Sequence, residues 1–346
     1  MNNNNKFPTF PSDCTSMLCK YLTKDVFEKL KDKKTANGFT LNDAIRSGLE
    51  NIESGIGVYA GDEESYSLFS PLFDPIIEDY HGFKPHQKHK SNMNLDDLNA
   101  SNPDPTGEYI LSTRIRVGRN LNNMPLGSAI SKEQRDEVES TVSQSLMKLE
   151  GELSGTYYPL FGMSKEVQNN LIKEHFLFKE GDRFLASAGL NRNWPEGRGI
   201  YHNNDKTFLV WINEEDQLRI ISMQKGGDIK AVFNRLVKAV KSIEQEIQFA
   251  YNTHLGYISS CPTNLGTAMR ASVHIKLPKL SKDMKRFQAI TDKYHLQIRG
   301  INGEHSESKD GIYDISNRRR LGVTEVMCVT DMYNGVVELI STEKSL

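Results

Sequence analysis

Arginines recur in several segments of the chain that are predicted to be strands. Because side chains alternate between the two faces of a strand, Arg114 and Arg116 in the segment 109–117 point to one face, together with Ser112. Guanidinium groups stay charged and bind phosphate oxygens in a bidentate manner. The arginines in or beside the predicted strands therefore predict a site for a polyanion such as a triphosphate; they are Arg114, Arg116, Arg219, Arg270 and Arg299.

A second group of residues could act on the other reactant. Cys261 begins the loop 261–266, where the hydroxyl of Thr263 can hydrogen-bond a thiolate and favour it. Glu215 lies at a predicted hairpin tip, and Glu304 lies in a Gly-flanked loop. Each of these residues has a simpler interpretation: a buried inert thiol, solvated loop carboxylates and, for the arginines, solvated strand faces with surface ion pairs.

Several common nucleotide and metal motifs are excluded. The segment 55–60 fits the dinucleotide fingerprint G-x-G-x-x-A, but a predicted helix rather than a strand precedes it. No glycine is followed by lysine, so a Walker A loop is absent, and neither H-R-D nor H-E-x-x-H occurs. Any nucleotide must therefore be held without a P-loop.

Composition is that of an ordinary globular protein. The 346 residues are 37% hydrophobic and 25% charged, with a net charge of -2, which gives no argument for nucleic acid or an anionic membrane as partner. We find no apolar run of membrane length and no signal peptide. The four cysteines, Cys14, Cys19, Cys261 and Cys328, lack the spacing of a zinc ribbon or a disulfide scaffold, which favours a reduced, intracellular protein in the cytoplasm.

Two parts with different patterns are expected to position these residues. Residues 1–90 are predicted to be helical, with Thr23 and Thr40 as candidate N-caps and Gly55 as the C-terminal stop of the helix that follows Thr40. The turn-rich segment 91–107 is predicted to be a linker. Residues 108–346 alternate between strands and helices. The predicted strands are 109–117, 207–213, 218–224, 256–260, 271–277, 296–300 and 312–316, and a long amphipathic helix covers 229–247.

The sequence as a whole resembles the phosphagen (ATP:guanidino) kinases, and among them it is most similar to the arginine kinases. The resemblance rests on the segments 112–120, 176–185, 194–203, 208–228, 261–278, 299–305 and 313–322, and it extends over essentially the whole chain. It implies an α+β fold with a small all-helical N-terminal domain and a larger domain whose antiparallel sheet is flanked by helices. It also implies reversible transfer of the γ-phosphoryl of MgATP to the guanidino group of L-arginine, giving ADP and phosphoarginine.

The resemblance implies roles for individual residues. Catalysis would rest on Glu215, Glu304, Cys261, Arg219, Arg270 and Arg299. The nucleotide would be bound by Ser112, Thr113, Arg114, Ile115, Arg116, His175, Arg219, Arg270, Ala271, Ser272, Val273, His274, Arg299, Gly300, Ile301, Asn302, Gly303 and Glu304. The guanidino substrate would be bound by Ser54, Gly55, Ile56, Gly57, Val58, Tyr59, Glu215, Cys261, Thr263 and Glu304.

Further expectations concern motion, the metal and the assembly. The loops 54–59 and 300–309 are expected to act as lids over the site. The resemblance also implies that Glu53, where arginine kinases commonly carry Asp, pairs with Arg183. It implies that Mg²⁺ is held through the phosphates and water rather than by protein ligands, and that the protein is a monomer. The alternatives are a kinase for taurocyamine, lombricine or creatine, a protein-arginine kinase, and a silent binding protein on the same fold.

Overall fold

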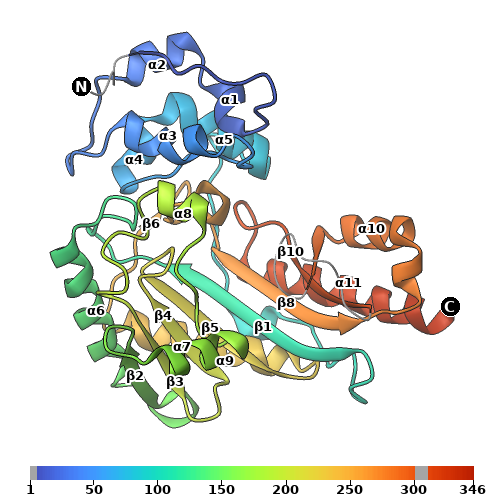
Figure 1. The fold of residues 1–346 in the computed structure, drawn as a ribbon. Helices are drawn as coiled ribbons and strands as arrows, with labels where there is room; N and C mark the ends of the chain where they lie inside the picture. Colours follow the sequence, from blue (N-terminus) through green and yellow to red (C-terminus); the bar gives the residue numbers. More distant parts are fainter. Residues whose placement is uncertain (1–5, 301–310) are drawn as a thin grey trace.

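The N-terminal part is built from short helices whose starts are capped as the sequence predicts. The computed structural model describes residues 6–300 and 311–346. Thr23 and Thr40 are the N-caps of α2 and α3, and Thr40 forms a capping box with Asp43. The helices of this part are α1 (Met17–Tyr21), α2 (Lys24–Leu30), α3 (Leu41–Glu50), α4 (Glu63–Leu68) and α5 (Ser70–His81) (Figure 1).

The rest of the chain forms an antiparallel sheet with helices. The strands are β1 (Ile110–Arg119), β2 (Gly155–Pro159), β3 (Gly199–Asn203), β4 (Phe208–Ile212), β5 (Leu218–Lys225), β8 (Met269–Lys276), β9 (Leu296–Arg299) and β10 (Ile312–Asn317). They pair in the order β2-β3-β4-β5-β1-β8-β10-β9, so the two central strands, β5 and β1, come from distant parts of the sequence. The α+β fold class, with its helical N-terminal part and antiparallel sheet, is confirmed.

Helices lie against the sheet and at its edges. They are α6 (Lys132–Leu146), α7 (Lys165–Lys173), α8 (Arg183–Ser187), α9 (Ile229–Glu244), α10 (Met284–Lys293) and α11 (Glu325–Ser345), with short 3₁₀ turns η1 (Leu95–Asp97), η2 (Gly151–Leu153), η3 (Pro262–Asn264) and η4 (Leu280–Lys282). The apolar side of α9 is fully buried against β1 and β5, and α11 packs on β8 and β10. The sheet face under these helices holds the main hydrophobic core. The opposite face carries polar side chains along β1 and β8 and a smaller apolar cluster that includes Ile200, Leu209, Trp211 and Ile221.

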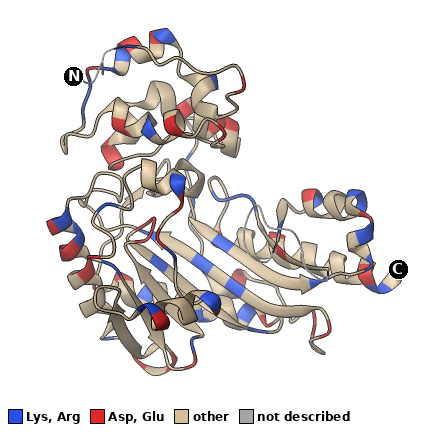
Figure 2. Ribbon diagram, viewed as in Figure 1, with Lys and Arg blue, Asp and Glu red and all other residues tan. Residues whose placement is uncertain are grey.

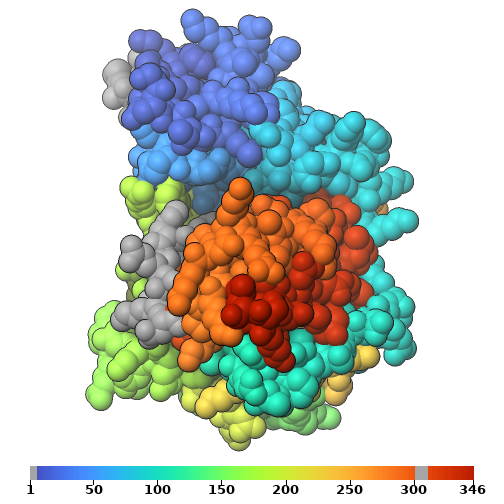
Figure 3. Space-filling view, turned by 90° about the vertical axis from the view of Figure 1, so that its right-hand side faces the viewer, coloured from blue at the N-terminus to red at the C-terminus, as the bar shows by residue number. Residues whose placement is uncertain are grey.

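The N-terminal helices share their core with later residues. Their apolar cluster includes Leu126, Leu190, Ile258, Cys261 and Leu321 from the rest of the chain. In Figure 3 the N-terminal helices, in blue, form the upper end of the molecule. The segment that follows them, in cyan, lies beside the C-terminal residues, in red. The predicted boundaries at residues 90 and 107 stay a prediction.

Three expectations about local structure are wrong. The segment 256–260 is a strand only over β7 (Gly256–Tyr257), which pairs with β6 (Tyr251–Asn252), because the carbonyls of Ser259 and Ser260 are bound by N-terminal residues instead. Helix α3 ends at Glu50, so Gly55 is not its C-terminal stop.

The third concerns the cysteines. Cys14 and Cys19 form a disulfide, so the expectation of four reduced thiols is wrong for this pair. The turn into α1 brings their Cα atoms to 6.4 Å, which the linear spacing did not reveal. Cys261 and Cys328 are free and buried.

A test of this packing uses Gly48 on α3. A methyl group added there would lie 2.3 Å from the carbonyl oxygen of Gly57, a backbone atom that cannot rotate away. We therefore expect Gly48→Ala to lower the free energy of unfolding by roughly 1–3 kcal/mol, as overpacking does. Urea denaturation measures the effect. Gly55→Ala is the matched control, because its added methyl group meets open space; equal stability losses in the two variants would contradict this packing.

Candidate active site

The predicted arginines lie on neighbouring strands and project from one face of the sheet. Arg116 of β1 is directly opposite Arg270 of β8, and Arg219 of β5 is opposite Gly118 of β1. Further along, Asp314 of β10 lies between His274 of β8 and Arg299 of β9. In the charge-coloured view, basic positions gather along β1 and its neighbours (Figure 2).

The arginines are close enough to repel one another. Burial, together with the charges of Arg270 and Arg219, lowers the pKa of Arg114 to about 10. Burial and the charges of Arg219, Arg270 and Arg114 lower the pKa of Arg116 as well. Like charges directly opposite each other destabilise a sheet. The face therefore carries a cost in the free protein that a bound polyanion would offset.

Acidic side chains form salt bridges with some of these arginines and not with others. Arg219 lies 2.5 Å from Glu214 and 3.0 Å from Glu215, and Arg270 lies 2.8 Å from Asp314. Within the described residues, Arg114 and Arg116 form no salt bridge. Arg114 instead lies over the ring of Trp211, at 5.2 Å. These two guanidinium groups are available to an anionic ligand.

A cavity of about 340 Å³ opens on this face. It is lined by Ser112, Arg114, Glu174, His175, Met223, Arg270, Ser272, His274 and Asp314. Six of these nine are residues predicted to bind the nucleotide: Ser112, Arg114, His175, Arg270, Ser272 and His274. The cavity thus combines cationic, hydroxyl and imidazole groups, which suits a phosphorylated ligand with an aromatic base.

Four predicted nucleotide residues have side chains on the opposite face. Ile115, Ala271 and Val273 belong to the main hydrophobic core, and the hydroxyl of Thr113 donates to the carbonyl of Gly226. Strand alternation is the reason, since each lies between residues that face the cavity. A nucleotide on the cavity side could therefore contact only the backbone of these four residues, and their place in the nucleotide site stays a prediction.

Glu215 joins the arginine face to the cysteine loop. One of its carboxylate oxygens accepts from Arg219, and the other accepts from the amide Nδ2 of Asn264 at 3.3 Å. Burial raises the pKa of Glu215 to about 7, with Arg219 acting in the opposite direction and Asp216 adding to the rise. A carboxyl group with this pKa can accept a proton near neutral pH.

The surroundings of Cys261 disfavour its thiolate form. Its sulfur lies 3.1 Å from the hydroxyl of Thr263, which is the contact expected from the sequence. Burial, followed by the charge of Glu215, nevertheless raises its pKa to about 12. The hydrogen bond from Thr263 lowers this pKa, as expected from the sequence, but burial has the larger effect in the unliganded protein. The role of Cys261 as a thiolate stays a prediction.

Residues of the N-terminal part form hydrogen bonds with backbone carbonyls of the cysteine loop and of the two residues before it. The hydroxyl of Tyr66 donates to Ser259 at 2.6 Å, the amide of Ala60 donates to Ser260 at 2.8 Å, and Nε2 of His81 lies 2.9 Å from the carbonyl of Pro262. Because a carbonyl only accepts, Nε2 of His81 carries the proton.

The loop 54–59 is packed rather than open. Ser54, Ile56, Val58 and Tyr59 are all buried, and Gly57 has a positive φ of 76° against Leu18 and Gly48. Close packing on α1 and α3 ties the loop to these helices, and its motion as a lid stays a prediction. Within the described residues, the amides of Gly55, Ile56 and Val58 donate no hydrogen bond. Because Val58 is fully buried, the amides of Gly55 and Ile56 are the ones that can receive an anion.

Helix α8 also contacts α3 and the segment that follows it. Arg183 pairs with Glu53, as the resemblance implies, so the longer acid still makes the contact. Ser47 of α3 donates to the carbonyl of Phe184 at 2.8 Å, and Arg46 donates to the carbonyl of Ser187 at 2.7 Å.

Some of the residues predicted to form the site lie outside the described part of the chain. Ile301, Asn302, Gly303 and Glu304 lie there, as does most of the expected lid 300–309. Gly300 and Arg299 are described, and Nη2 of Arg299 lies 3.4 Å from the side-chain oxygen of Gln297.

Four residues that shape the site were missed from the sequence. Trp211 lies under both Arg114 and Arg219, Glu214 and Asp314 pair with arginines, and Asn264 holds Glu215. Trp211 could have been found, since the hairpin register places it opposite Arg219. Asp314, a lone acid in an apolar strand, is a similar signal.

No metal centre or membrane helix is evident in the described part of the chain. Residues 6–300 and 311–346 contain no group of three or more His, Cys, Asp or Glu side chains arranged to hold a metal ion. None of the helices in these residues is long and apolar enough to span a membrane.

Family profiles and individual proteins match this chain over most of its length. Residues 12–78 match the ATP:guanido phosphotransferase N-terminal domain, and residues 137–346 match the C-terminal catalytic domain of the same family. Arginine kinase Lit v 2 from Penaeus vannamei is 58% identical over 97% of this chain and 94% of its own length. Arginine kinase from Callinectes sapidus is 57% identical over the same shares.

Solved structures agree with these matches. A lombricine kinase is 39% identical, with a TM-score of 0.93 over 100% of this chain and 96% of its own. The duplicated taurocyamine kinase from Schistosoma mansoni with bound transition state analog components is 47% identical, with a TM-score of 0.91; the alignment covers 96% of this chain and 47% of that duplicated one. The arginine face, the hairpin acid and the cysteine loop described above thus occur in a chain that belongs to the ATP:guanido phosphotransferase family.

Proposed function

We propose that this protein is an arginine kinase, which reversibly transfers the γ-phosphoryl of MgATP to the guanidino group of L-arginine. The products are ADP and phosphoarginine. The observation that carries the proposal is the row of arginines on one sheet face, ending at Glu215. A polyanion and a guanidinium cation would meet where these opposite charges adjoin. The high identity to several arginine kinases supports arginine as the guanidino substrate.

The arginines bind the phosphates and stabilise charge during transfer. Arg114 and Arg116 lack salt-bridge partners in the described residues, and Arg219 and Arg270 complete the row. As a metaphosphate-like group passes between oxygen and nitrogen, fixed cations stabilise its spread charge. In this proposal the Mg²⁺ that accompanies ATP is held by the phosphates and water. Mg²⁺ contributes further neutralisation of the phosphates when bound.

Glu215 orients the guanidino group and accepts its proton. The substrate guanidinium has a pKa of about 13 if it resembles free arginine, so it is a poor nucleophile until a proton leaves. Glu215 binds its N–H groups, aligns one nitrogen with the γ-phosphorus and receives the proton as the N–P bond forms. The P–O bond to ADP breaks in the same transfer. Glu304 stays a predicted second carboxylate for the same group.

The loop 54–59 holds the other end of L-arginine. The free amides of Gly55 and Ile56 suit an α-carboxylate, and the buried Tyr59 lies close enough to Cys261 and Glu215 for their charges to act on its hydroxyl. A bound guanidinium would lower the pKa of the Cys261 thiol by its positive charge. Cys261 thus acts electrostatically and forms no covalent intermediate. The monomeric state and the cytoplasmic location stay predictions.

A kinase for taurocyamine is the second candidate, because one of the matched structures is a taurocyamine kinase. A coupled assay with MgATP separates the two. We expect phosphoryl transfer to L-arginine to exceed transfer to taurocyamine, lombricine or creatine by at least an order of magnitude. Preference for any of the other three would replace arginine in the proposal.

The phosphate contacts can be tested by removing one unpaired guanidinium. We expect Arg116→Ala to weaken MgATP and ADP binding in calorimetry by roughly tenfold or more, since a charge-assisted hydrogen bond is worth about 1.5–3 kcal/mol. Arg286→Ala, an exposed arginine on α10, is the matched control. Unchanged nucleotide affinity in Arg116→Ala would remove this residue from the site.

The role of Glu215 predicts a pH dependence. Its pKa of about 7 leaves it protonated at lower pH, so kcat/KM for arginine should fall as the pH drops below about 7. We expect Glu215→Gln to lower turnover by about 10²–10⁴-fold and to remove this step from the profile. Glu214→Gln is the control that should keep the step. A step that persists in Glu215→Gln belongs to another group.

A further inference from the structure

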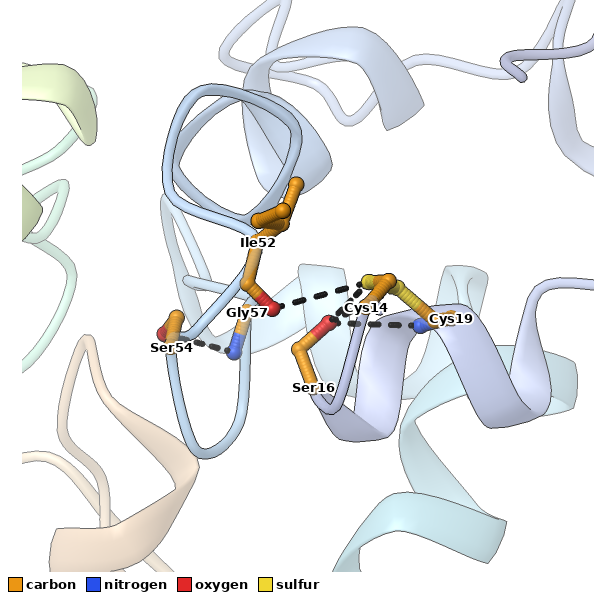
Figure 4. Close-up of a disulfide and its surroundings, with 6 residues drawn as sticks. All are labelled: Cys14, Ser16, Cys19, Ile52, Ser54 and Gly57. Atoms are coloured by element: carbon orange, nitrogen blue, oxygen red, sulfur yellow. Dashed lines mark hydrogen bonds between the residues drawn. A yellow bond between two sulfur atoms is a disulfide. The ribbon is translucent and has the colours of Figure 1, made fainter. Parts of the chain in front are cut away.

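The Cys14–Cys19 disulfide closes over the first turn of α1. The two residues flank Ser16, the N-cap of this helix, whose hydroxyl accepts from the amide of Cys19 at 3.4 Å. Both cysteines are partly exposed, whereas Cys261 and Cys328 are buried. Figure 4 shows the disulfide beside Ile52, with Ser54 and Gly57 of the substrate loop close by. A reagent in solution can therefore reach this pair before the other thiols.

The same turn of α1 supports the loop 54–59 through its backbone. The amide of Thr15 donates to the carbonyl of Ile52 at 3.3 Å, and the amides of Met17 and Leu18 donate to the carbonyls of Gly55 and Ile56 at 3.1 Å each. These donors lie between Cys14 and Cys19. The sulfur of Cys14 also lies 3.6 Å from the carbonyl oxygen of Ile52.

Because a peptide group is planar, a hydrogen bond to its carbonyl also fixes the direction of its N–H group. The carbonyl of Gly55 and the amide N–H of Ile56 belong to one rigid trans peptide group and point in opposite directions. When Met17 holds that carbonyl, the N–H of Ile56 is fixed as well. This N–H is one of those left for the carboxylate of the substrate. A well-ordered first turn of α1 thus holds the Ile56 N–H in the direction that ligand binding requires.

We propose that Cys14 and Cys19 are a reversible redox modification site that tunes binding of the guanidino substrate. The proposal rests on the proposed function for the nature of that substrate. A small dithiol reduces the pair by exchange: the Cys14–Cys19 S–S bond breaks, two S–H groups form, and the dithiol becomes a cyclic disulfide. Two electrons and two protons pass to the protein. Oxidation by a disulfide of the same class reverses each change.

The oxidised form binds arginine more tightly than the reduced form. Loss of the cross-link frees the α1 turn, so more order must be gained when the substrate binds. We expect reduction to raise the KM for arginine by about 3- to 10-fold while the KM for MgATP and kcat change little. The nucleotide contacts lie on the sheet, away from this turn.

The test compares the full-length protein equilibrated in reduced and in oxidised dithiothreitol. Alkylation followed by mass spectrometry identifies which cysteines change state, and steady-state kinetics gives the KM for each substrate. The double variant Cys14→Ser, Cys19→Ser is the matched control and should keep the KM of the reduced form in both buffers. An equal arginine KM in both states, a shift that persists in the double variant, or a pair that stays reduced in the oxidised buffer would each overturn the proposal.

Hydrogen exchange separates this proposal from the proposed function. We expect amides of residues 52–57 to exchange faster after reduction of wild type, with no such change in the double variant. If neither redox state phosphorylates arginine, the proposed function fails, but faster exchange still supports the link between the cysteine pair and the loop. Identical exchange in the two states contradicts that link whatever the activity.

Discussion

The arginines on one face of the sheet repel one another, and the remainder of the fold has to offset this repulsion. Arg116 and Arg270 face each other across paired strands, an arrangement that weakens an ordinary sheet. The opposite face compensates with a large apolar core under α9 and α11. Partial neutralisation by Glu214 and Asp314 limits the repulsion without removing it. The sheet can thus hold a cationic face that is completed by a ligand.

Strand alternation links these two faces residue by residue. On β1, Arg114 lines the cavity and Arg116 lies on the same face of the strand, while Ile115 and Val117 belong to the core. A shift of register by one residue would bury guanidinium groups and expose apolar side chains. The core and the site therefore specify each other, and the positions of the arginines are as firmly determined as the packing beneath them.

The sequence predicted what depends on local periodicity and on family resemblance. The arginine face, the helix caps at Thr23 and Thr40 and the antiparallel fold follow from alternation, capping chemistry and matching segments. Long-range contacts were not predictable in this way. The pairing of Asn264 with Glu215, the disulfide and the burial that keeps Cys261 protonated all depend on how distant segments pack. The close packing of Gly57 in the loop 54–59 against α1 and α3 was missed for the same reason.

The apolar cluster shared between the N-terminal helices and the rest of the chain has a consequence for recombination. Leu126, Leu190 and Ile258 cover surfaces of the helical part that would otherwise face water. A fragment that ends near residue 90 would expose those surfaces and would tend to aggregate. Chimeras that exchange the first five helices between related enzymes would also have to exchange these partner residues. An exchange of the helices that carry the substrate loop thus also affects the stability of the whole molecule.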